Sequence, residues 1–444
     1  MSKSLSSTQS VIRCAGAVFL LAVFAVWSAP RASAQSENVL LSLPGGVDGS
    51  QPHGPLAEDS AGNLYGTTFA GGAHGFGAVI KLSLVSGVWQ ETVLHSFTGG
   101  HDGANPYASV LLGADGKLYG TTGFGGKSGA CGGGGCGVVF ELSPVGGGWV
   151  ETVLHAFSGG PDGAIPQGLA LDSHGNIFGL AETGGTSQAC NQLVGCGTAF
   201  ELSVQSAGGW KFGVIHIFSG GSDGGTPSLR ASPLVDAGGN VYGATFAGGN
   251  AKFCSNTFPN VVGCGVAFRL SPVAGGGWSE KVLYRFFGFA DGAFPTGGLV
   301  MDSSGNLYGA ASAGGDTRSK NCAGDYGCGV IFQLTPTSSG LWKAAPLHTF
   351  ESTDGLSPLA LAFDHSGNLY GPTGGGGDAV CNCGTVFELA AGAGGWTFST
   401  LHAFVGGTDG RFPTGVMLDS SGNVFGPTSS GGSAGDGTFY EITP

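Results

Sequence analysis

The sequence predicts an all-β fold: a seven-bladed β-propeller of four-stranded blades, closed by an N-terminal strand that completes the last blade. Three observations predict it. A short phrase ending in an aromatic residue and glycine recurs seven times, each repeat contains four strand-like phrases, and the two chain ends carry complementary incomplete repeats. Strand-like repeats at a period near fifty residues are typical of propellers rather than of helical solenoids.

The recurring phrase sets the number of blades. Its spacing of 54 to 66 residues is regular enough to make the array one domain, because each repeat buries its face on its neighbour. The composition includes 90 Gly and 20 Pro in 444 residues, yet 41% of the residues are hydrophobic, which argues against disorder. The seven copies begin at Asn63, Lys117, Asn176, Asn240, Asn306, Asn368 and Asn423.

Each repeat divides into four phrases that are short, rich in β-branched or aromatic residues, and bounded by Gly, Ser, Asp or Pro. The first follows a proline, as in residues 295–302, and the second begins near the aromatic phrase, as in residues 307–311. The third has the pattern Gly-Val-aromatic-x-Leu, as in residues 329–334. The fourth starts near a tryptophan and ends in Leu-His-x-Phe, as in residues 149–157.

The two ends of the chain predict how the ring closes. Residues 38–43 stand where other repeats have their fourth strand, and residues 437–442 form a third strand with none after it. We therefore expect the N-terminal segment to pair with the C-terminal one, which hides two strand edges that would otherwise invite aggregation.

Residues 1–34 have the pattern of a secretory signal peptide. Lys3 and Arg13 precede an apolar run over residues 15–27, and Ala32-Ser33-Ala34 offers a cleavage site. An uncleaved membrane anchor is the alternative, since the run is near the short limit for spanning a bilayer. We expect cleavage, with residues 35–444 forming one domain.

Loss of the three basic residues of this segment would change the net charge from −13 to −16. An acidic surface argues against nucleic acid and anionic lipid as partners. We expect a monomer outside the cell or at its surface, with no membrane insertion after cleavage and a glycan or an extracellular protein as its partner.

The phrases Asp-Gly-x-x-Pro, Gly-Asn-Leu-Tyr-Gly-Thr-Thr and Glu-Thr-Val-Leu-His-x-Phe occur together from about Asn38 to Pro444. In this combination the chain resembles the tandem repeats of the choice-of-anchor GloVer family of bacterial exported and surface proteins. The resemblance implies exported repeats with varied C-terminal anchors, and it implies no catalytic residues. The sequence ends without such an anchor, so we expect a freely secreted protein.

An aspartate recurs between the fourth and first strand phrases of all repeats. A ring of carboxylates could bind a hard cation such as calcium. The alternative, which we favour because every copy is kept, is that each aspartate caps its own turn. The seven residues are Asp48, Asp102, Asp162, Asp223, Asp291, Asp354 and Asp409.

The loops between second and third strands differ most among repeats. They are short at residues 71–77 and 431–437 and long in the third to fifth repeats, as at residues 248–265. Variable loops on a rigid scaffold are where binding usually occurs, so these loops predict a raised lip on one face, unless they are ornamental insertions. The lip residues we single out are Phe253, Phe258, Arg318 and Tyr326.

Ten of the 11 cysteines pair off within single loops, which indicates disulfides in an exported protein. No Cys-x2-Cys motif or Cys/His quartet supports zinc. The last pair has one intervening residue, so its bond would be strained, and the alternative is that these two thiols stay reduced. The pairs are Cys131–Cys136, Cys190–Cys196, Cys254–Cys264, Cys322–Cys328 and Cys381–Cys383.

The recurring histidines of the fourth strands are interpreted as packing residues or hydrogen-bonded spacers. The recurring tryptophans are interpreted as core residues between blades, with a platform for sugar binding as the alternative. Two residues depart from the repeat: Glu182 ends a second strand where Thr or Ser is usual, and Arg230 lies in an insertion near the channel mouth. Together they could bind an anionic or sugar ligand, and the alternative is that they are ordinary surface charges. We rank an extracellular binding or scaffold module first. A secreted enzyme acting on polysaccharide or a lactone-like substrate, using Glu182, Arg230 and an aspartate of the ring, ranks second. A purely structural surface protein ranks third.

Overall fold

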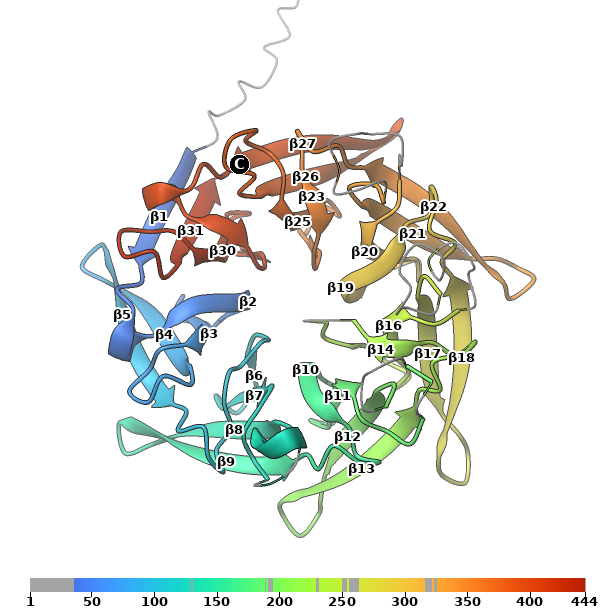
Figure 1. Cartoon of the computed structure of the whole chain (residues 1–444), viewed down its shortest axis with the longest axis horizontal. Helices are drawn as coiled ribbons and strands as arrows, with labels where there is room; N and C mark the ends of the chain where they lie inside the picture. The colour runs from blue at the N-terminus through green and yellow to red at the C-terminus, as the bar shows by residue number, and fades with distance from the viewer. Residues whose placement is uncertain are drawn as a thin grey trace, which may run out of the picture. The chain divides into compact units, whose positions relative to one another are not determined.

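The computed structural model describes residues 36–127, 129, 131–187, 189–190, 195–228, 231–249, 254, 263–315, 322 and 326–443. Residues Gln35–Pro444 form one compact unit. Within it, seven antiparallel sheets are arranged as blades around a central axis, and each has its first strand innermost (Figure 1). The predicted seven-bladed propeller is confirmed.

In each blade the strands lie side by side from the axis outward, each antiparallel to its neighbour (Figure 1). Blades 1 to 6 are simple meanders, whereas the outermost strand of blade 7 comes from the N-terminal end of the described chain. Blade 1 comprises β2 (Ser50–Glu58), β3 (Leu64–Ala70), β4 (Ala78–Val85) and β5 (Val88–Ser96), and blade 2 comprises β6 (Leu111–Leu112), β7 (Leu118–Thr122), β8 (Val138–Val145) and β9 (Gly148–Ala156). Blade 3 comprises β10 (Ala164–Leu171), β11 (Ile177–Thr183), β12 (Thr198–Val204) and β13 (Trp210–Ile217). Blade 5 comprises β19 (Ala293–Met301), β20 (Leu307–Ala313), β21 (Val330–Pro336) and β22 (Trp342–Thr349).

In the other three blades the innermost strand is split into two short pieces that pair with the same second strand. Blade 4 comprises β14 (Gly225–Pro227), β15 (Leu234–Val235), β16 (Val241–Ala247), β17 (Val266–Pro272) and β18 (Trp278–Arg285). Blade 6 comprises β23 (Leu356–Pro358), β24 (Ala362–Phe363), β25 (Leu369–Gly375), β26 (Thr385–Gly392) and β27 (Gly395–Ala403). Blade 7 comprises β28 (Arg411–Pro413), β29 (Met417–Leu418), β30 (Val424–Ser430), β31 (Thr438–Thr443) and β1 (Ser36–Ser42).

Closure follows the predicted exchange of strands. β1 pairs antiparallel with β31, with Ser36 opposite Thr443 and Ser42 opposite Thr438. The first strand of the described chain is therefore the outermost strand of the last blade, as Figure 1 shows in blue beside red. The N-terminal segment thus supplies the fourth strand that the last repeat does not encode.

The hydrophobic core lies between the blades rather than within one sheet. A phenylalanine at the end of the fourth strand of blades 1 to 6 is fully buried and packs edge-on against the third strand of the next blade, as Phe97 does on Phe140 with ring centroids 5.2 Å apart. The fourth-strand tryptophans also cross the junctions, as Trp149 does to Tyr65 at 6.3 Å. These contacts confirm the packing interpretation of the tryptophans.

A second contact repeats at every junction, including the closing one. The residue before the proline of each Asp-Gly-x-x-Pro phrase has φ between 53° and 60°, an uncommon conformation for a residue with a side chain. Its N–H donates to a carbonyl in the second-to-third loop of the preceding blade, for example Ile165 to Cys136 at 2.9 Å. The seven residues are Gln51, Asn105, Ile165, Thr226, Phe294, Ser357 and Phe412.

The predicted disulfides are present in all five loops: Cys131–Cys136, Cys190–Cys196, Cys254–Cys264, Cys322–Cys328 and Cys381–Cys383. Each disulfide closes one loop. The backbone carbonyl of the second cysteine in that loop accepts the junction hydrogen bond from the next blade. The disulfides therefore brace the loops to which the neighbouring blade is attached. In the described part of the chain, no helix is long and apolar enough to cross a bilayer.

Candidate functional site

A pocket of about 490 Å³ lies where blades 2, 3, 5 and 6 face the axis. Its volume is within the range of about 300–1,000 Å³ that small-molecule sites occupy. We call it the axial pocket. It is lined by Tyr107, Phe124, Ile165, Gln167, Glu182, Thr296 and Leu359.

The repeat itself places these side chains together. Ile165 and Gln167 lie near the start of the first strand β10, and Glu182 lies at the end of the second strand β11. In a meander, the start of the first strand and the end of the second are at the same edge of the blade. The axial pocket therefore opens toward the face that carries the fourth-to-first and second-to-third loops, which is the face of the predicted lip.

Gln167 and Glu182 form the polar part of the pocket. The Gln167 side-chain amide donates to the Glu182 carboxylate at 3.3 Å and to the carbonyl of Ile165 at 3.1 Å, and the Gln167 residue is only 1% exposed. These bonds hold the amide in one orientation. Burial raises the pKa of Glu182 to about 7, so its carboxyl changes charge near neutral pH.

Aromatic rings form another wall of the pocket. The rings of Tyr107 and Phe124 lie 6.3 Å apart, and Tyr107 also contacts Phe69, with centroids 4.7 Å apart. Tyr107 and Phe124 are half-buried, so their exposed faces border the pocket. Aromatic side chains together with a few fixed polar groups are the usual composition of a ligand site.

The described lining residues offer few ionisable groups. Among the described lining residues, Glu182 is the one carboxyl group. Glycoside hydrolysis ordinarily uses a pair of carboxyl groups, one as acid and one as base or nucleophile. The pocket therefore combines an amide, a carboxyl group and the faces of aromatic rings.

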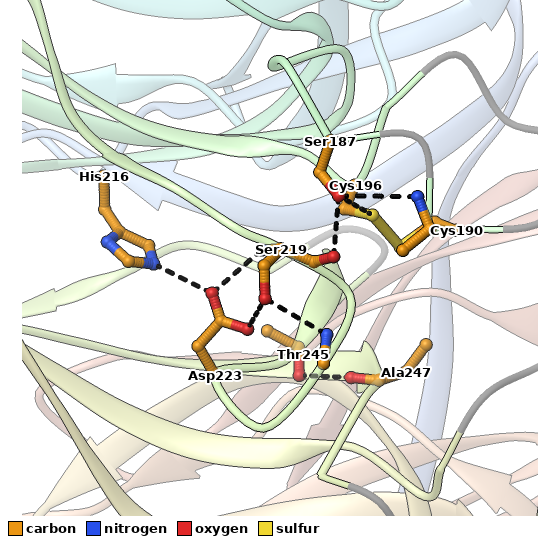
Figure 2. The surroundings of a disulfide bond; sticks show 10 residues. Ser187, Cys190, Cys196, His216, Ser219, Asp223, Thr245 and Ala247 are labelled. Carbon is orange, nitrogen blue, oxygen red and sulfur yellow. Dashed lines mark hydrogen bonds and ion pairs between the residues drawn. A yellow bond between two sulfur atoms is a disulfide. The ribbon is translucent and has the colours of Figure 1, made fainter.

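The recurring Asp-Gly phrase places its aspartates elsewhere, at the outer edge of the blades. Asp223 accepts a hydrogen bond from the N–H of Ser219 at 2.8 Å and lies 3.7 Å from Nε2 of His216, on the outermost strand of blade 3. Figure 2 shows this group beside the Cys190–Cys196 disulfide. Ser187 ties the two loops together by donating to the Ser219 carbonyl at 2.7 Å.

The same geometry recurs around the ring. Asp102, Asp162, Asp354 and Asp409 each lie within 3.3 Å of the fourth-strand histidine of the preceding blade, and Asp291 accepts from Tyr284, which replaces that histidine, at 3.0 Å. Each of these aspartates also accepts from a backbone N–H of its own loop. Asp48 has no such histidine, because Leu41 stands at the corresponding place. The six aspartates other than Asp48 therefore act as turn caps, and none of the seven lines the axial pocket. Calcium binding by this ring stays a prediction.

The predicted lip falls largely on residues whose placement is not described. Phe253, Phe258 and Arg318 lie outside the described residues, as does Arg230 at the channel mouth. Tyr326 is half-buried and packs against the core between blades 4 and 5, and its carbonyl accepts a hydrogen bond from the N–H of Gly314 at 2.7 Å. Of the residues we predicted for a site, the structure places Glu182 in the axial pocket.

Tyr107, Phe124, Gln167, Thr296 and Leu359 were not predicted. Four of them occupy the same repeat position, immediately after the proline of the Asp-Gly-x-x-Pro phrase. That position varies strongly among the repeats although its neighbours are constant, and this contrast is the signal that could have identified them. The seven residues at this position are His53, Tyr107, Gln167, Ser228, Thr296, Leu359 and Thr414.

The fold and site define a class of protein: a disulfide-braced, seven-bladed repeat propeller with a ligand-sized axial pocket. The chain belongs to the Gloeobacter/Verrucomicrobia repeat family, whose model matches residues 25–253, 132–322 and 317–444. This confirms the resemblance seen in the repeats. A comparison with curated proteins found no matching sequence.

The solved structures to which the chain is similar are distant in sequence. A gluconolactonase of Xanthomonas campestris is 12% identical, with 77% of this chain and 87% of that chain covered and a TM-score of 0.40. A carbohydrate-active enzyme of family AA12 from Trichoderma reesei is 14% identical, with coverage of 93% and 96% and a TM-score of 0.43. A proposed oxidoreductase (glucose dehydrogenase) of Thermus thermophilus is 15% identical, with coverage of 92% and 100% and a TM-score of 0.44.

Proposed function

We propose that this protein is an extracellular carbohydrate-binding propeller that holds one end of a glycan in the axial pocket. The observation that carries the proposal is that the hydrogen-bonded pair Gln167 and Glu182 and the rings of Tyr107 and Phe124 line one pocket of about 490 Å³. The pocket thus offers hydrogen-bonding groups and an apolar face to the same small ligand.

A neutral sugar suits this pocket better than a charged ligand. Glu182 opposes an anion when it is ionised, and the net charge of the chain, −13, repels anionic polymers at longer range. Sugar hydroxyls can donate to the carboxylate and accept from the amide, and the C–H face of a pyranose packs on aromatic rings. Buried polar groups that match a ligand in this way also reject analogues that lack the partner hydroxyl.

Export is the second part of the proposal. Five disulfides indicate an oxidising compartment, because cytosolic thiols are kept reduced. The signal-like pattern of residues 1–34 agrees with this. A glycan of the cell surface or its surroundings is therefore the ligand class to test first.

The test is a glycan-array screen of residues 35–444 with and without calcium, followed by mass analysis of each bound glycan. We expect calcium-independent binding of an intact neutral glycan. A shortened glycan would replace this proposal with the enzyme hypothesis. Glycan binding that requires calcium would assign the binding site to the aspartate ring. If no glycan on the array binds, a protein ligand or a purely structural role would remain.

Two matched variants locate the site. Phe124→Ala removes a ring from the pocket wall, whereas Phe76→Ala removes a 41% exposed ring in the corresponding loop of blade 1, outside the pocket lining. Loss of a stacking ring costs roughly 1 kcal/mol or more, which is about a fivefold to tenfold loss of affinity. We expect that loss for Phe124→Ala alone. Equal affinities for the two variants would place the ligand elsewhere.

A further inference from the structure

The outer junctions between blades repeat a group of three ionisable residues. The fourth-strand histidine of one blade meets the loop aspartate, and a glutamate from the fourth strand of the next blade approaches them. Three junctions carry the complete set: His95, Asp102 and Glu151; His216, Asp223 and Glu280; His402, Asp409 and Glu37.

The junction of blades 6 and 7, which includes the closing strand β1, differs from the other two in its geometry. One potential metal-ligand atom from each of Glu37, His402 and Asp409 lies within 4.8 Å of the other two. Among the described residues, no other group of three His, Cys, Asp or Glu side chains meets this condition. Nε2 of His402 lies 2.9 Å from Oδ1 of Asp409. Oε1 of Glu37 is shielded from solvent and has no hydrogen-bond partner in the described structure.

From this geometry we propose that Glu37, His402 and Asp409 bind a divalent cation of the zinc type where the closing strand β1 meets blade 6. One imidazole nitrogen and two carboxylate oxygens are a donor set that suits Zn²⁺, with water completing a tetrahedron. Calcium is a poor match, because it takes six to eight oxygen ligands. A cation would also supply the partner that Oε1 of Glu37 lacks.

The three ligands come from segments that are far apart in the chain. Glu37 lies on β1, His402 on β27 of blade 6, and Asp409 ends η3 (Gly407–Asp409), which leads into blade 7. A bound cation would therefore fasten the N-terminal strand to the two last blades. Because the site exists only in the closed ring, binding must stabilise that ring against opening.

The other two junctions provide matched controls within the same molecule. Glu151 occupies the place of Glu37 at the junction of blades 1 and 2, and its Oε1 is likewise without a described partner. Glu37→Gln and Glu151→Gln remove the same carboxylate in equivalent surroundings. Only Glu37→Gln removes a proposed metal ligand. The comparison therefore separates the effect of losing a buried carboxylate from the effect of losing the cation.

The experiment measures zinc binding to metal-free residues 35–444 by calorimetric titration and follows the unfolding temperature with and without ZnCl2. We expect one zinc per chain, a higher unfolding temperature with zinc for the wild type and Glu151→Gln, and an affinity loss of about tenfold or more for Glu37→Gln, since even outer-sphere partners of metal ligands are worth that much. X-ray absorption should show nitrogen and oxygen ligands.

Equal zinc affinities for Glu37→Gln and Glu151→Gln would overturn the proposal, as would zinc binding without a rise in unfolding temperature. His402→Gln tests whether zinc binds at this site or at another histidine on the surface. We expect this variant to lose zinc binding, and wild-type zinc affinity in the variant would contradict the proposal. Because apo protein is compared with zinc-loaded protein for each variant, a variant that is merely less stable still reports whether zinc stabilises it.

Discussion

The backbone N–H of Gln51 donates a hydrogen bond to the carbonyl oxygen of Asp436, with a donor–acceptor distance of 2.7 Å. These residues are 385 positions apart, yet the bond is the same one that joins every other pair of neighbouring blades. The closing junction is therefore built like the rest of the ring. Its stability depends on the strand β1 and on the residues that follow it.

Leu43 tests the closing junction. It is completely buried with Ile80 and Phe439, at the place that a phenylalanine occupies in the other repeats. Leu43→Ala should lower the free energy of unfolding by about 2–5 kcal/mol, because a buried cavity would remain. Urea unfolding measures the change. Val47→Ala, at a side chain that is 65% exposed, should leave the midpoint unchanged, and equal effects would refute this role of Leu43.

Gly415 tests how tightly blades 7 and 1 approach each other near the axis. A Cβ at this position would lie 2.3 Å from the backbone nitrogen of Pro55. Gly415→Ala should therefore destabilise the protein by about 1–3 kcal/mol through overpacking.

Gly213 on β13 is the control for Gly415, because a Cβ there meets nothing within 4 Å. Gly213→Ala should stabilise the protein by roughly 0.4–1 kcal/mol by restricting the unfolded chain. Thermal unfolding of the two variants should thus shift in opposite directions. A shift in the same direction would mean that the approach of the blades at Gly415 is less close than the structure indicates.

The disulfides should contribute to stability through their short loops. Cys190 and Cys196 are six positions apart, so replacing both with alanine should cost roughly 2 kcal/mol by the chain-entropy relation. Urea unfolding under non-reducing conditions checks the cost, and mass mapping of the wild type checks the pairing. Free thiols at these positions in the oxidised protein would show that the loop is not braced in this way.

The Glu182 carboxylate should lower the stability of the folded protein and strengthen glycan binding. Burial raises its folded-state pKa from the ordinary 4.5 to about 7. The stability contributed by the protonated group is fully present below pH 4.5 and is lost as the pH rises through 7. Glu182→Gln should therefore unfold at a higher temperature than the wild type at about pH 8, above the folded-state pKa.

The same variant should bind its glycan more weakly, by roughly tenfold or more, because a charge-assisted hydrogen bond is lost. Unfolding and titration at about pH 5 and about pH 8, on either side of the raised pKa, measure both effects. A variant that is more stable at the higher pH yet binds with unchanged affinity would remove Glu182 from the ligand site while leaving its burial intact.

Glu91 should have a similar effect on stability far from the pocket. Burial, with a smaller contribution from Asp48, raises its pKa from 4.5 to about 8. The protonated form therefore stabilises the fold below pH 4.5, and this contribution is lost as the pH rises through 8. Glu91→Gln should raise the unfolding temperature at about pH 9 and change it little at about pH 4. A constant difference at all pH values would contradict the raised pKa.

The fold could be predicted from the sequence because the same pattern of strands and turns occurs in seven repeats. Hairpin turns, strand phrases and the position of residues 38–43 all indicate the same ring, and the structure confirms each of them. The disulfides could be predicted for a similar reason, since each pair lies within one loop and needs no knowledge of distant contacts.

The axial pocket could be predicted only in part. Glu182 stood out because it breaks the repeat at the end of a second strand. Gln167 and Tyr107 occupy a position that varies among the blades, and only the closure of the ring brings such residues from four blades around one pocket. The sequence pattern within one repeat does not predict which residues of different repeats lie together in the folded ring.

The most direct test of the account is a crystal structure of residues 35–444 with the glycan that binds best on the array. We predict that its terminal sugar lies on the axis, hydrogen-bonded to Gln167 and Glu182 and packed on Phe124. A sugar bound at the outer junctions, or on the long loops of blades 3 to 5 with the axial pocket empty, would contradict it.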